Sequence, residues 1–141
     1  MITYDFPSKQ WCNDGSPDIQ DLPSAIQFMN DKINLFAAQV RDMKCHPTSA
    51  YEAASWTIKA KEAATYLVTG LASDAPNLAV EAAVRGVSTL AVAQRVAAKA
   101  GALMALEACI SGISGRHRDN IALLTTAPEV FDYDWSTGWP L

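Results

Sequence analysis

Residues 25–43, AIQFMNDKINLFAAQVRDM, decide the fold class, because their hydrophobic side chains recur with the spacing of a helix. The hydrophobic positions follow one another in steps of three and four: Ile26, Met29, Ile33, Phe36, Val40 and Met43. This spacing places them along one side of an α-helix, as in a helical bundle or coiled coil. The helix should open near Asp21, with Pro23 in its first turn, and end before Pro47.

The segment that follows predicts two more helices. Ser49 and Glu52 have the spacing of a capping box, and Gly70 is a natural helix end, so one helix is expected between them. A short helix should begin at residues 73–74 and end at residues 85–86.

A long Ala-rich helix should follow, capped by Ser88 and extending past Gly115 to residue 124. Each glycine weakens a helix by about 1 kcal/mol relative to alanine. We therefore expect a bend or break between Gly112 and Gly115. The chain is thus predicted to be all-α, a bundle of three to four helices with one core. That core should contain Met29, Ile33, Phe36, Trp56, Leu67, Val96, Leu103 and Leu106.

The two ends of the chain differ from this helical middle. In residues 2–6 and 131–135, large hydrophobic side chains alternate with polar ones, a period typical of extended strands. We expect residues 1–141 to form a single domain with an N-terminal arm (1–21), a helical core (22–126) and an aromatic, acidic tail (127–141). The arm should pack on the helices or pair with the tail.

Composition excludes several classes of function. A net charge of −4, with only 11 basic residues spread along 141, argues against nucleic-acid binding. The odd number of cysteines, 3, favours a reducing cytoplasm over a secreted disulfide framework. The start of the chain lacks a signal-peptide pattern, and the apolar region 103–113 is interrupted by Glu107 and Gly112. We expect no membrane span.

No pattern in the sequence predicts catalysis, a metal site or a cofactor. The phosphate-binding glycine motifs and the HExxH zinc motif are absent. Cys45 and His46 are adjacent, but neighbours at a helix end need not face each other, so a solvated corner is the simpler interpretation. His117 lies between Arg116 and Arg118, and we expect an exposed polar turn of helix there. The protein is predicted not to be an enzyme.

Several segments between residues 30 and 126, and the end of the chain, resemble small helical tail-fibre assembly proteins (tail-fibre chaperones) of tailed bacteriophages. The segments that carry the resemblance are 33–36 (INLF), 52–56 (EAASW), 61–63 (KEA), 83–86 (AVRG), 96–100, 115–116, 119–121 (DNI), 134–135 (DW) and 138–140 (GWP). The resemblance implies a chaperone in the bacterial host cytoplasm that helps a fibre or tail protein to fold or trimerise. It equally suits a structural helical module that remains in the virion.

Aromatic residues near the two ends are the predicted partner-binding residues: Trp11, Phe131, Tyr133, Trp135 and Trp139. In an extended tail, Phe131, Tyr133 and Trp135 share one face, and large aromatics dominate protein interfaces. Two alternatives remain open. The tail either folds back as part of its own core or stays free to bind a fibre or tail protein. A homodimer is also expected, because the long helix carries two apolar stripes.

Overall fold

A computed structural model describes residues 1–45 and 49–141, which form five α-helices, one 3₁₀ helix and a two-stranded sheet. The predicted all-α class with one long helix is confirmed. The described residues divide into two compact units: unit 1 comprises Met1–Lys44 and Leu106–Leu141, and unit 2 comprises Cys45–Ala105. The single domain expected for residues 1–141 stays a prediction. It would mean that the two units unfold together as one cooperative domain.

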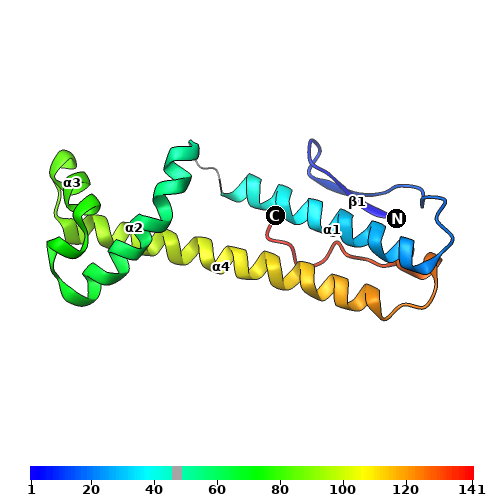
Figure 1. Ribbon diagram of the computed structural model, residues 1–141. Coiled ribbons are helices and arrows are strands. Elements are labelled where there is room, and N and C mark those ends of the chain that lie inside the picture. The colour runs from blue at the N-terminus through cyan, green and yellow to red at the C-terminus, as the bar shows by residue number, and fades with distance from the viewer. Residues whose placement is uncertain (46–48) are drawn as a thin grey trace. The chain divides into compact units, whose positions relative to one another are not determined.

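Unit 1 combines segments from both ends of the sequence. It contains β1 (Ile2–Asp5), β2 (Gln10–Asn13), α1 (Leu22–Lys44), the second part of α4 (Thr89–Ala122) and α5 (Ala127–Asp132). The two strands form an antiparallel hairpin in which Tyr4 is opposite Trp11. Helix α1 packs against α5, and Figure 1 shows the hairpin and the C-terminal segment beside α1.

The hydrophobic seam of α1 forms the centre of this unit. Met29, Ile33, Phe36 and Val40 are buried, as the helical spacing predicts. Phe36 lies in a cluster of aromatic rings whose centroids are 4.8 to 5.5 Å from its own: Tyr4, Phe6, Trp11, Trp135 and Trp139. The hairpin and the tail are therefore held on α1 by one shared aromatic core.

Unit 2 contains α2 (Ala50–Thr69), a 3₁₀ turn η1 (Ala72–Asp74), α3 (Pro76–Arg85) and the first part of α4. The Ser49 hydroxyl accepts a hydrogen bond from the Glu52 N–H at 3.0 Å, which caps α2. Gly70 ends that helix with a left-handed φ of 67°. The core of this unit consists mostly of small side chains: Ala63, Ala75, Leu78, Ala82, Val92, Ala93 and Val96.

The expectation of a single core is wrong, because the predicted residues separate between the units. Met29, Ile33 and Phe36 belong to the core of unit 1, whereas Val96 belongs to that of unit 2. Leu67 is 44% exposed and belongs to neither. A helical repeat identifies a hydrophobic face but does not identify which other face covers it.

Of the bend or break expected between Gly112 and Gly115, the break is absent, since α4 is continuous from Thr89 to Ala122. Four side chains on this part of α4 recur with helical spacing and are buried in unit 1: Ile110, Ser114, His117 and Ile121. Packing of this stripe outweighs the cost of about 1 kcal/mol that each glycine imposes on a helix.

The chain ends differ from expectation in detail. The N-terminal arm does contain a strand and packs on the helices, but β1 pairs with β2 and not with the tail. The tail is not extended throughout, because Phe131 lies in α5. The Thr126 hydroxyl and the Glu129 carboxylate form a capping box at the start of this helix, with Pro128 in its first turn. These local signals outweigh the alternating pattern.

Helix α4 is long and apolar enough, by length and composition, to cross a membrane, which differs from the expectation drawn from residues 103–113. Core helices of soluble proteins also meet this criterion, but they are mostly buried, whereas only 11% of the apolar stretch of α4 is buried. Side chains near both ends of α4 contribute to hydrophobic cores, Val92 and Ala93 in unit 2 and Ile121 in unit 1.

Candidate functional site

The predicted partner-binding aromatics lie together inside unit 1. Phe131, Trp135 and Trp139 are 3%, 2% and 8% exposed, and Trp11 and Tyr133 are half-buried. The rings of Trp11 and Trp135 pack edge to face with centroids 5.1 Å apart. Of the two alternatives for the tail, the structure therefore has the tail folded back on its own core. These side chains do not form an exposed strip.

Hydrogen bonds from both tail tryptophans satisfy their polar atoms within the unit. The Trp135 indole N–H donates to the Ile2 carbonyl oxygen at 3.0 Å, which joins the tail to β1. The Trp139 indole N–H donates to the Trp135 carbonyl oxygen at 2.8 Å. A partner that bound these rings would have to separate the tail from β1 and α1 first.

His117 of α4 fixes the same tail from the other side, and the expectation that it is exposed is wrong, since it is 1% exposed. Its Nδ1 lies 2.9 Å from the Tyr133 hydroxyl, and its Nε2 lies 3.0 Å from the Thr137 carbonyl oxygen. The Asn120 amide also donates to the Tyr133 hydroxyl, at 2.9 Å. A neutral ring satisfies every group: Nε2–H donates to Thr137, and Nδ1 accepts from Tyr133.

The surroundings of His117 favour that neutral form. Burial lowers its pKa from the ordinary value, and the Arg116 guanidinium adds to this effect. The Thr137 carbonyl and the Asp134 carboxylate act in the opposite direction without reversing the shift. His117 is thus a structural hydrogen-bonding group between α4 and the tail.

Unit 2 contains a solvent-accessible cavity of about 370 Å³. Helices α2, α3 and α4 all contribute to its walls. Most of its lining side chains are charged or aromatic: Trp56, Lys59, Glu81, Arg85, Arg95 and Lys99. A volume of this size lies within the range of about 300–1,000 Å³ that ligand sites in proteins usually have.

A buried carboxylate holds α3 against α2 and so fixes one wall of the cavity. Glu62 of α2 is 9% exposed and accepts hydrogen bonds from the backbone N–H groups of Asn77 and Leu78, both at 3.1 Å. It also accepts one from the Asn77 side-chain amide at 2.6 Å. These N–H groups begin α3, where a helix favours negative charge. Glu62 therefore replaces the local cap that Ala75 cannot provide.

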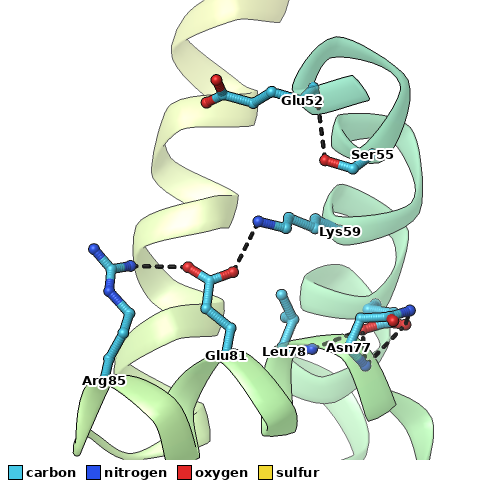
Figure 2. Close-up of polar contacts among 8 residues, drawn as sticks. Glu52, Ser55, Lys59, Asn77, Leu78, Glu81 and Arg85 are labelled. Carbon is cyan, nitrogen blue, oxygen red and sulfur yellow. Dashed lines mark hydrogen bonds and ion pairs between the residues drawn. The ribbon is translucent and has the colours of Figure 1, made fainter. Parts of the chain in front are cut away.

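Glu81 of α3 joins two cations at the cavity wall. Its carboxylate lies 2.8 Å from Lys59 Nζ and 2.8 Å from Arg85 Nη1, and Figure 2 shows it between these two side chains. The Lys59 ammonium group beside Glu81 is the main cause that lowers the pKa of its carboxyl. The carboxylate is therefore ionised at neutral pH and neutralises part of the positive charge.

The α4 wall is positively charged and is not neutralised in this way. Lys99 Nζ lies 4.3 Å from the centre of the Trp56 ring, a cation–π contact. Within the described part of the chain, neither Arg95 nor Lys99 has a carboxylate at ion-pair distance. Both side chains are exposed.

Sequence analysis missed this group of residues. The spacing of four between Glu81 and Arg85, and between Arg95 and Lys99, indicates shared helical faces. It does not show that the two faces meet around Trp56, which depends on how α2, α3 and α4 pack.

The sequence predicts no metal site and no catalytic site, and the structure bears on the metal site. Among residues 1–45 and 49–141, no group of three or more His, Cys, Asp and Glu side chains is arranged to hold a metal ion. The Cys45–His46 pair lies partly outside the described residues. Comparison with protein-family models, curated proteins and solved structures finds no match to this chain.

Proposed function

We propose that the protein acts by binding another protein, as an assembly chaperone for a phage tail-fibre or tail protein. The observation that carries the binding role is the distribution of exposed hydrophobic side chains. Most of the large ones among the described residues lie in unit 2. They include Tyr51 at 89%, Val68 at 87% and Val84 at 84% exposed. Soluble proteins rarely expose a large contiguous apolar patch unless it forms an interaction surface.

Helix α3 shows this most clearly, because it has two apolar faces. Leu78 and Ala82 are buried in the core of unit 2. Val80 and Val84, also four residues apart, are 65% and 84% exposed. A helix needs only one apolar face for its own unit. The second face is the binding surface in this proposal, and the buried aromatics of the tail stabilise unit 1.

The choice of a tail-fibre or tail protein as the client rests on the sequence resemblance. Fibre proteins are rich in β structure that forms slowly, and their exposed strand edges aggregate before assembly. A helper with an exposed apolar face can cover such intermediates. The alternative, a structural module that remains in the virion, uses the same face for a permanent contact, and detection of the protein in purified virions would favour it.

The test is co-expression with a phage tail-fibre protein, followed by measurement of soluble, trimeric fibre. We expect the wild-type chain to increase this fraction and the double variant Val80→Asp/Val84→Asp to lose the effect. Leu123→Asp in unit 1 is the matched control, because Leu123 is 79% exposed and lies outside the proposed surface. Circular dichroism should show all variants folded. Equal fibre solubility with and without the wild-type chain would refute the proposal.

A further inference from the structure

We infer that the cavity of unit 2 binds an acidic segment of the protein partner, with Arg95 and Lys99 accepting its carboxylates. The inference rests on the proposed function, because it assigns a chemistry to the partner proposed there. It is drawn from the charge, the shape and the surroundings of the cavity.

The charge of the cavity is the first argument. The chain has a net charge of −4 and only 11 basic residues, yet Lys59, Arg85, Arg95 and Lys99 all line this one space. The lining carboxylates, Glu52 and Glu81, are fewer than the cations. The cavity therefore attracts anions although the chain as a whole repels them.

The arrangement of these cations is the second argument. Glu81 already pairs with Lys59 and Arg85. A bound anion would therefore be attracted most strongly by the α4 wall, where the positive charges are not neutralised. Arg95 and Lys99 lie four residues apart on one helix, and like charges at this spacing destabilise a helix. An anion between them would relieve that repulsion. The Trp56 ring already holds the Lys99 ammonium group at the cavity, so less side-chain freedom is lost on binding.

The surroundings favour a carboxylate-bearing protein segment as the ligand. A guanidinium group binds a carboxylate through two parallel hydrogen bonds, and arginine-containing clusters are a common means of binding acidic motifs. Trp56 and Val96 add apolar surface to the lining of the cavity. A peptide can contact these apolar groups while its carboxylates occupy the cavity.

The site can be tested with a fluorescein-labelled peptide of eight glutamates, with a peptide of eight glutamines as the uncharged control. Fluorescence anisotropy should show binding of the glutamate peptide alone, weakening as salt is added. Arg95→Gln/Lys99→Gln should weaken the affinity about tenfold or more, as loss of charged hydrogen bonds does. Lys61→Gln, an exposed lysine of α2 outside the cavity, should leave it unchanged.

Two outcomes would overturn the inference. One is equal affinity of the double variant and the wild-type protein for the glutamate peptide. The other is saturation of the site by inorganic phosphate, followed through the Trp56 indole N–H signal in NMR spectra, without any response to the peptide. Both variants replace exposed side chains, and their melting curves would show that they are folded.

The same variant distinguishes this inference from the proposed function. If Arg95→Gln/Lys99→Gln still keeps the fibre protein soluble as well as wild type does, the acidic-segment site is wrong and the chaperone proposal stands. If the wild-type chain binds the glutamate peptide but has no effect on fibre solubility, the chaperone proposal is wrong.

Discussion

His117 connects α4 to the tail through two ring nitrogens, and both contacts suit the neutral ring. Burial lowers its pKa below the ordinary value of 6.5, so the folded protein resists protonation more than the unfolded chain does. Protons then bind preferentially to the unfolded state once the pH falls below that ordinary value. The contribution of His117 to stability is complete above this pH and is lost as the pH falls towards the lowered pKa.

We therefore predict that the free energy of unfolding of unit 1 decreases between about pH 7.5 and pH 5.5. In His117→Phe this decrease should be much smaller, although the variant is less stable at pH ~7.5 because Tyr133 and Thr137 lose their partner. Urea denaturation at several pH values measures both effects. The same pH dependence in both would contradict this role for His117.

From the sequence, both Phe36 and Trp56 are expected in the hydrophobic core, but the structure gives them different surroundings. Phe36 is 3% exposed, whereas Trp56 is only half-buried at the rim of a cavity. We predict that Phe36→Ala costs about 3–5 kcal/mol and Trp56→Ala about 1–2 kcal/mol. Hydrogen exchange in α1 and in α2 measures the two effects separately. Equal costs would mean that the exposure of Trp56 does not reflect its packing.

At the scale of elements, α4 remains helical across Gly112 and Gly115. Neither position requires glycine, because no neighbouring atom approaches too closely for a side chain. A Cβ atom added at either position would meet no atom within 4 Å. Alanine at each site should therefore raise the free energy of unfolding by about 0.5–1 kcal/mol, because it restricts the unfolded chain. Gly70→Ala is the control and should lower stability, since Gly70 has a φ of 67°. Thermal melting checks the sign, and destabilisation by Gly112→Ala would contradict the prediction.

The local signals of the sequence predicted the elements well. The caps at Ser49, Gly70 and Gly86 and the seam of α1 all lie where the spacing of side chains placed them. Failures arose wherever distant segments decide the outcome. The continuity of α4 and the burial of His117 depend on packing that no local pattern contains.

The candidate site illustrates the same limit. Aromatic residues near the chain ends were correctly recognised as residues that need burial, but their own unit buries them. The cavity residues were not recognised, because Lys59, Glu81 and Arg95 come from three different helices. Charged residues on separate helices give no sequence signal for the space between them.

At the scale of the whole molecule, the two units have separate cores, and the tail belongs to only one of them. Deletion of residues 128–141 removes Val130, Phe131, Trp135 and Trp139 from unit 1. If the tail were free to bind a partner, as one alternative from the sequence has it, this deletion would leave the fold intact. Because the structure buries the tail in unit 1, we predict that hydrogen-exchange protection is lost in α1 and kept in α2 and α3.

Leu78→Ala supplies the reciprocal control for this experiment. Leu78 is fully buried in unit 2, so its truncation should reduce protection in α3 and leave α1 unchanged. If either change removed protection from both units together, the chain would unfold as one cooperative domain, as the sequence predicted for residues 1–141.

The discontinuous composition of unit 1 has a consequence for synthesis on the ribosome. Unit 2 is a single uninterrupted segment, Cys45–Ala105, and all of its residues precede the tail and leave the exit tunnel before it. Residues 1–44 emerge earlier still, yet Phe36 and the hairpin must wait for Trp135 and Trp139 to complete their core. Domains generally fold as units during translation. The aromatic seam of α1 therefore stays uncovered on the nascent chain until the tail emerges, and a pause in translation before residue 131 would prolong that exposed state.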